Sequence, residues 1–286
     1  MQKIKNLLKK TFLYKQVRYF LDRRVYKGKT KINILETFPS FVSNGWGLYP
    51  IRAKLTVQSI NQVIPGLSSL SELNEKKVSK INTIDVDDIL KKESDDFKKL
   101  RDLFNEYGSD KATTHDYYKL YASLFPNPTK VKKVFEIGLG TNNTDIVSTM
   151  GKKGSPGASL RAFRDYYENA EIFGADFDKR ILFSEDRIKT FFVDQTDEKT
   201  FDDLGEIIGG DFDLMIDDGL HSPNANIHSL KFFIGKINIG GWAIIEDVCP
   251  KTHYIWSLAS AVLPENFSSI FISTKNSNMF IVQRNW

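Results

Sequence analysis

The chain has 286 residues, of which 41% are hydrophobic and 27% charged, with a net charge of +4, a composition typical of an ordinary globular protein. It contains no apolar run of the roughly 18–20 residues that would span a bilayer, and no secretory signal follows its basic N-terminus. Its one cysteine, Cys249, excludes an internal disulfide and a cysteine cluster for zinc, so a cytoplasmic location is expected.

The charge is distributed unevenly. Residues 1–99 contain 20 Lys/Arg and 10 Asp/Glu, so a basic front precedes an acidic remainder that could hold a metal. Residues 1–32 predict a basic amphipathic helix, because apolar side chains recur among the lysines and arginines at near-helical spacing. Such a helix can lie in a membrane interface, so one hypothesis is a peripheral contact of residues 1–30 with the inner face of the membrane. The alternative is that it packs on the body of the protein or on a second subunit.

Residues 33–107 form the next region. Turn signals at 44–47 and 65–66 predict an irregular cap or a contact in a homo-oligomer. A helix is expected at the end of this region, with Gly108 positioned to end it. The apolar stripe of this helix consists of Phe97, Leu100, Phe104 and Tyr107.

From residue 131 short apolar runs alternate with amphipathic segments. This pattern predicts a doubly wound α/β fold, in which helices cover both faces of a mostly parallel, seven-stranded sheet. Only residues 275–277 separate the last two expected strands, which is too short for a parallel crossover, so these strands should form an antiparallel hairpin. The expected strands are 132–138, 171–176, 190–194, 212–217, 241–246, 268–273 and 278–284, and the expected helices are 158–168, 198–208, 224–235 and 252–262.

Three strand ends carry residues suited to a nucleoside ligand. Gly138 and Gly140 follow the first strand and would let a ligand approach the backbone, although such a pair can also be a simple tight turn. Asp176 ends the second strand, where a carboxylate can accept both ribose hydroxyls, or it is a surface aspartate. The third strand ends in Asp194 and Gln195, a polar pair that could edge an adenine.

The fourth and fifth strands end in acids. The fourth ends in Asp217-Asp218-Gly219-Leu220-His221 and the fifth in Glu246-Asp247, and parallel strands bring such ends together. Asp218, Glu246 and Asp247 can offer oxygen ligands to Mg²⁺, and His221 could take a proton from a hydroxyl. The alternatives are a histidine that supports a loop and an acidic pair at an exposed strand end.

The segment from residue 108 to 247 resembles the macrocin/mycinamicin type of sugar O-methyltransferase, a class I S-adenosylmethionine-dependent enzyme. Six motifs carry the resemblance in the same order, and the ordered set is far more specific than any one of them. They are Gly108-Ser109-Asp110-Lys111 with His115 and Tyr117, Glu136-Ile137-Gly138, Gly157-Ala158-Ser159-Leu160, Asp194-Gln195-Thr196-Asp197, Asp217 to His221, and Glu246-Asp247.

The resemblance implies that residues 108–286 form a domain that binds S-adenosylmethionine and methylates a sugar hydroxyl. By it, Asp218, Glu246 and Asp247 bind Mg²⁺, and His221, with Asp218, is catalytic. The resemblance also assigns to cofactor binding Lys111, His115, Tyr117, Glu136, Ser159 and Asp217, beside Gly138, Gly140, Asp176, Asp194 and Gln195. The sequence does not identify the acceptor: a sugar of a surface polysaccharide or of a glycosylated natural product is expected, and a small phosphorylated capsule precursor is the alternative.

Two departures from the family pattern concern the cavity. The loop from Gly140 to Gly157 is longer than the family's tight turn, and Leu220 stands where a small serine is common. They put in doubt how the methionine end of the cofactor is enclosed and what shape the acceptor pocket has.

Three other functions compete with this interpretation. A nicotinamide oxidoreductase is disfavoured by the missing third glycine and by the acids at the fourth and fifth strand ends. A non-catalytic nucleoside-binding protein on the same fold is disfavoured by the intact set of Asp218, His221, Glu246 and Asp247. A nucleic-acid methyltransferase is disfavoured because no Asn/Asp-Pro-Pro-aromatic motif follows the fourth strand, so no nucleic-acid partner is expected.

Overall fold

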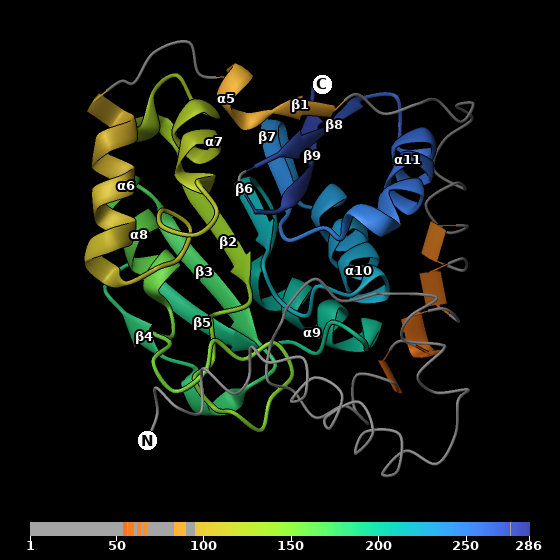
Figure 1. The fold of residues 1–286 in the computed structure, drawn as a ribbon, viewed down its shortest axis with the longest axis horizontal. Helices are drawn as coiled ribbons and strands as arrows, with labels where there is room; N and C mark the ends of the chain where they lie inside the picture. Colours follow the sequence, from red (N-terminus) through yellow and green to blue (C-terminus); the bar gives the residue numbers. More distant parts are fainter. Residues whose placement is uncertain are drawn as a thin grey trace, which may run out of the picture.

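A mixed sheet forms the centre of the molecule. The computed structural model describes residues 54–55, 57–59, 62–63, 66–67, 83–89, 95–274 and 276–286, and within them nine strands form one sheet in the order β1-β8-β9-β7-β6-β2-β3-β5-β4 (Figure 1). The strands are β1 (Thr83–Asp85), β2 (Lys133–Ile137), β3 (Glu171–Asp176), β4 (Ser184–Glu185), β5 (Ile188–Phe192), β6 (Phe212–Asp217), β7 (Ile237–Ile245), β8 (Phe267–Ser273) and β9 (Asn278–Arg284).

The seven expected strands are present, but the expected number of seven is wrong. Strands β1 and β4 extend the sheet at its two edges, and they were missed because runs of three and two residues show no alternation of apolar and polar side chains. The central strands β7, β6, β2, β3 and β5 are parallel, as expected. The hairpin of β8 and β9 is antiparallel, which confirms the inference from the short connection between them.

Alternating side chains of the strands feed two hydrophobic cores. Val134 and Ile172 point to the core under α6 (Asp95–Tyr107), α7 (Tyr117–Ser123) and α8 (Ala158–Tyr166). Phe135 and Phe173 point to the opposite core, under α9 (Glu198–Ile208), α10 (Pro223–Ile234) and α11 (His253–Val262). Figure 1 shows the two helix groups on either side of the sheet, the doubly wound arrangement that the alternation predicts.

Helix ends follow local chemistry. Gly108 ends α6 with a φ of 78°, as its position predicts, and Asp197 caps α9 by accepting from the backbone N–H of Lys199. The four helices expected after residue 131 begin and end within two residues of their predicted bounds. Helix α7 was not expected, because its seven residues include three tyrosines, which favour strands, and do not reach two helical turns.

The described residues before 108 pack on the same layers. Strand β1 pairs with β8, and Phe104 of α6 meets Phe163 of α8 edge to face at 5.3 Å. Val63 and Leu67 are buried in the core on the α10 side. The predicted domain boundary between residues 107 and 108 stays a prediction. Helix α6, which precedes this boundary, packs in the same hydrophobic core as α8, which follows it.

The short helix α5 (Val86–Ile89) and the 3₁₀ turns Pro128–Lys130, Lys179–Ile181 and Pro250–Thr252 complete the described elements. The basic helix expected at residues 1–32, and the membrane or subunit contact expected of it, lie outside the described residues. Among the helices that the structure describes, none is long and apolar enough to cross a membrane.

Candidate active site

A cavity of about 460 Å³ opens at the carboxyl ends of the parallel strands. Its walls come from five successive strand ends: Gly138 and Gly140 after β2, Asp176 of β3, Asp194 after β5, Asp218 after β6, and Glu246 and Asp247 after β7. The strand ends that the sequence singles out therefore meet around one cavity. This is the usual ligand-binding edge of a doubly wound sheet.

The turn after β2 requires glycine. Gly138 has a φ of 94°, and a Cβ atom added to it would lie 2.1 Å from the carbonyl oxygen of Asp218. The turn after β2 therefore lies directly against the loop after β6. Gly140 also has a positive φ, of 75°, beside Met150. A ligand can approach the backbone closely here.

Asp176 supports this turn while it lines the cavity. Its Oδ2 accepts from the backbone N–H of Leu139 and its Oδ1 from that of Asp178, both at 2.7 Å. Burial raises the pKa of Asp176, although these backbone N–H groups oppose the shift. Each carboxylate oxygen keeps a further lone pair, so Asp176 can still accept ribose hydroxyls.

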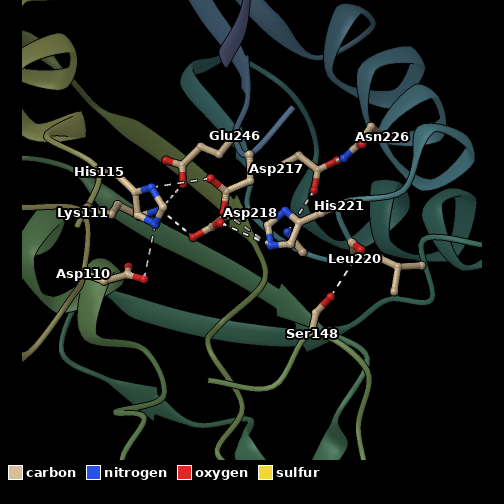
Figure 2. Close-up of polar contacts among 12 residues, drawn as sticks. Asp110, Lys111, His115, Ser148, Asp217, Asp218, Leu220, His221, Asn226 and Glu246 are labelled. Carbon is tan, nitrogen blue, oxygen red and sulfur yellow. Dashed lines mark hydrogen bonds and ion pairs between the residues drawn. The ribbon is translucent and has the colours of Figure 1, made fainter. Parts of the chain in front are cut away.

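Gln195 and Asp217 form a hydrogen-bonded pair beside the cavity. The side-chain amide of Gln195 donates to Oδ1 of Asp217 at 2.7 Å and accepts from the backbone N–H of Leu220 at 2.8 Å. Asp217 is completely buried, and its Oδ2 accepts from Asn226 at 2.9 Å, a contact drawn in Figure 2. Asp217 does not line the cavity, and its expected contact with a cofactor stays a prediction. Gln195 lines the cavity, but its amide is already bound to these neighbours.

Asp194 stands at the start of the turn that leads into α9. Its Oδ1 accepts from the backbone N–H of Thr196 at 2.9 Å, and both residues line the cavity. This is a local turn in which the side chain replaces a backbone acceptor. Its role toward a cofactor stays a prediction.

Three side chains converge at the other end of the cavity. Nε2 of His221 lies 3.9 Å from Oδ1 of Asp218 and 3.8 Å from Oδ2 of Asp247, as Figure 2 shows for the first pair. One ligand atom from each of the three residues lies within 4.8 Å of the others. Burial raises the pKa of Asp247, but His221, His115 and the hydroxyl of Tyr117 together lower that pKa below its ordinary value. The surroundings of Asp247 therefore favour its charged form.

His115 and Tyr117 also lie at this end. The two rings stack with centroids 4.9 Å apart, and the Tyr117 hydroxyl donates to Oδ1 of Asp247 at 2.5 Å. Nδ1 of His115 is 3.8 Å from the same oxygen of Asp247. Both residues line the cavity, but they meet the acidic end and not the glycine turn.

A buried network lies behind the acidic end. Nζ of Lys111 is 2.6 Å from Oδ2 of Asp218 and also donates to Oε2 of Glu246, whose Oε1 accepts from the hydroxyl of Tyr121. Oε1 of Glu136 is 3.3 Å from the same Nζ, and its Oε2 accepts from Ser159. Lys111, Glu136 and Ser159 do not line the cavity. Their expected contact with a cofactor stays a prediction.

The acidic end fits a divalent metal ion. Asp218 and Asp247 offer carboxylate oxygens on the cavity side, and His221 adds a nitrogen. Nδ1 of His221 is buried and has no hydrogen-bond partner among the described residues. Glu246, expected as a third ligand, lines the cavity but has both of its oxygens bound to Lys111 and Tyr121. The carboxylates that converge on the cavity side are therefore those of Asp218 and Asp247, and Nε2 of His221 faces both of them.

Some cavity residues were not expected from the sequence. Lys54, Leu55 and Gln58 line the cavity from the N-terminal region, and the buried Tyr121 of α7, which does not line the cavity, binds Glu246 from behind. The long loop after Gly140 contributes Ser148 and Met150, and Ser148 Oγ donates to the carbonyl of Leu220 at 3.3 Å (Figure 2). Neither set carries a recognisable motif. The one available signal was the length of the loop.

Comparisons with known proteins identify methyltransferases among the relatives of this chain. No family model matches the chain. It is 29% identical over 150 residues to the 8-demethyl-8-alpha-L-rhamnosyl tetracenomycin-C 2'-O-methyltransferase of Streptomyces olivaceus, which covers 52% of this chain and 37% of that protein. It is 33% identical over 93 residues to the mycinamicin VI 2''-O-methyltransferase of Micromonospora griseorubida, covering 32% of this chain and 23% of that protein.

The matched segments thus span less than two fifths of the length of these two relatives. Among solved structures, the MycE methyltransferase of the mycinamycin biosynthetic pathway, in complex with Mg and SAH, matches with a TM-score of 0.51 at 20% identity, over 65% of this chain and 53% of that chain. At this identity the match establishes the fold. The chain therefore has the class I methyltransferase fold, and over about half of its length it is a sequence relative of the macrocin and mycinamicin type of sugar O-methyltransferase.

Proposed function

We propose that this chain transfers a methyl group from S-adenosylmethionine to a sugar hydroxyl, with the help of a divalent cation. The observation that carries the proposal is the convergence of Asp218, His221 and Asp247 at one end of a cavity whose other end is the glycine turn and Asp176. One end suits a nucleoside, and the other suits a hydroxyl that must lose its proton. The sequence relatives named above, two sugar O-methyltransferases, support the same reaction.

The nucleoside half of the cavity would hold the methyl donor. Asp176 offers lone pairs for the ribose, and the backbone at Gly138 and Gly140 leaves room for the rest of the ligand. S-Adenosylmethionine would supply an electrophilic methyl group on its sulfonium. The protein's task is to align the acceptor oxygen with that methyl carbon and to exclude water.

The acidic half would prepare the acceptor. Asp218 and Asp247 would hold a divalent cation, with Mg²⁺ the first candidate because the ligands are carboxylates, and it would lower the pKa of the acceptor hydroxyl. Nε2 of His221 faces both carboxylates and is placed to accept the hydroxyl proton. Such a base contributes about 10²–10⁴-fold to a rate.

The acceptor is proposed to be a sugar of a glycosylated natural product or of a surface polysaccharide. The first of these classes is supported by the names of the relatives. The test is methyl transfer from labelled S-adenosylmethionine to a panel of free sugars, glycosylated natural products and polysaccharide fragments. Transfer to a hydroxyl supports the proposal, and transfer only to nitrogen or to nucleic acid contradicts it.

A further inference from the structure

Lys111 places a buried ammonium group among three carboxylates. Its Nζ lies 2.6 Å from Oδ2 of Asp218 and 3.3 Å from Oε1 of Glu136, and it donates to Oε2 of Glu246. Lys111 and Glu246 are each 1% exposed, and Glu136 is fully buried. An ammonium has three N–H donors and no acceptor: two are used in the hydrogen bonds to Asp218 and Glu246, and Glu136 adds an ion pair.

The backbone around Lys111 holds it in this position. After Gly108 ends α6, the backbone N–H groups of Thr113 and Thr114 donate to the carbonyl of Asp110, and that of Tyr118 donates to the carbonyl of Lys111. The chain therefore turns sharply between α6 and α7, directly beneath the strand ends. The side chain extends from this turn past the ring of Tyr117, with Nζ 5.8 Å from the ring centroid.

The charges around the ammonium of Lys111 balance its own. Asp218, Glu246 and Glu136 all approach Nζ closely in a buried space. The three carboxylates in turn need a cation, because desolvated like charges repel each other strongly. Lys111 thus supplies a permanent positive charge where an acidic site would otherwise attract a metal ion.

The same contact fixes the orientation of Asp218. Because Oδ2 is bound to Lys111, Oδ1 is left on the side of His221, where the ligand atoms of the acidic end converge. Glu246 is oriented likewise, between Lys111 and the hydroxyl of Tyr121. We propose that Lys111 is a fixed cation that orients Asp218 and Glu246 and limits this acidic site to one divalent metal ion.

The inference rests on the metal-dependent function proposed above and adds a positioning residue to it. A second divalent ion between Asp218 and Glu246 would have to take the place of the ammonium. Without the ammonium, that space is bordered by oxygens of Asp218, Glu246 and Glu136, which form a hard donor set. Removal of the charge of Lys111 should therefore create a second metal position.

The experiment counts the ions that bind. Mn²⁺ binding to the full chain is measured by equilibrium dialysis and by electron paramagnetic resonance, in the absence of any methyl acceptor. We expect one ion per wild-type chain and two for Lys111→Met, with magnetic coupling between the two ions. Lys119→Met is the matched control, since Lys119 also pairs with two aspartates but lies away from the cavity, and it should bind one ion. One ion of wild-type affinity in Lys111→Met overturns the inference.

A second variant covers the possibility that Lys111→Met does not fold. Lys111→Met with Glu136→Gln removes one negative charge together with the positive one, so the net charge of the buried set is unchanged. It should still bind two ions. The rise in unfolding temperature from EDTA to Mn²⁺ should also be larger for this variant than for wild type. One bound ion in this variant overturns the inference. A wild-type chain that binds no Mn²⁺ contradicts the metal dependence of the proposed function itself.

Discussion

Nε2 of His221 faces Oδ2 of Asp247 across 3.8 Å, and both residues have backbone in the left-handed region, with φ of 53° and 52°. This conformation is uncommon for residues other than glycine. Two residues in this conformation, at the ends of different strands, thus face each other in one cavity.

His221→Asn should lower methyl transfer by about 10²–10⁴-fold while the protein stays folded. Asparagine tolerates a positive φ better than most residues, so this change removes the base with little effect on the backbone. Initial rates are measured from pH 6 to 10, and the loss should shrink as hydroxide replaces the missing base. His253→Asn is the control, because His253 is outside the cavity. An unchanged rate in His221→Asn would remove His221 from the reaction.

Asp176→Ala should weaken binding of S-adenosylhomocysteine by about 10–100-fold, because hydrogen bonds to a charged group each contribute about 1.5–3 kcal/mol. The change removes the proposed ribose acceptor and also the acceptor for the backbone of Leu139. Isothermal calorimetry measures the affinity, and NAD should not bind to the wild-type chain. The exposed Asp186 serves for a control, Asp186→Ala. Binding of NAD alone would refute the methyltransferase assignment.

Gly138→Ala should destabilise the protein and abolish S-adenosylhomocysteine binding. The added Cβ would be 2.1 Å from the carbonyl oxygen of Asp218, so the two loops must separate. Gly151→Ala is the matched control: its φ is also positive, at 74°, but no heavy atom of the described residues would lie within 4 Å of its Cβ. The control should lose only about 1–2 kcal/mol from backbone strain. Urea unfolding measures the loss of stability in each variant. Equal losses would show that the close contact of residue 138 with Asp218 does not affect stability.

Prediction from sequence succeeded where the signal is local. The apolar runs of β2, β3 and β6 and the polar residues that follow them are short patterns, and parallel pairing then brings Gly138, Asp176 and Asp218 to one edge. The role of Lys111 could not be predicted in this way, because its partners are 107 and 135 residues away. Asp217 and Gln195 look like ligand-binding residues, and only the fold shows that they bind each other.

Asp178 should make stability depend on pH below neutrality. Its carboxylate accepts from Arg180, Thr141 and Asn143, and these bonds hold the pKa of Asp178 well below its ordinary value. A depressed pKa stabilises the folded state above the unfolded pKa of about 4, and this contribution is lost as the pH falls through the lower folded value. Asp178→Asn should therefore be less stable than wild type at pH 7.

The measurement for Asp178 is the urea midpoint of both proteins between pH 7 and pH 3. The difference between them should narrow below about pH 4, where the Asp178 carboxylate of the unfolded chain becomes protonated while that of the folded protein is still charged. A difference that stays constant over this range would show that the charge of Asp178 does not stabilise the fold. Asp202→Asn, at an exposed position of α9, should show no such difference.

Methyl transfer should stop in EDTA and return when Mg²⁺ is restored, because Asp218 and Asp247 otherwise face each other without a cation between them. Asp247→Asn should abolish metal-dependent turnover but leave S-adenosylhomocysteine affinity unchanged, since the proposed cofactor site lies on the ends of β2, β3 and β5. Glu246→Gln tests the expected third ligand: it should lower Mn²⁺ affinity less than Asp247→Asn does, because the oxygens of Glu246 are bound to Lys111 and Tyr121. Calorimetry with S-adenosylhomocysteine measures cofactor binding, and direct Mn²⁺ titration measures metal binding, so the two affinities are determined separately for each variant. Full activity in EDTA would exclude the metal from the reaction and leave His221 to activate the hydroxyl alone.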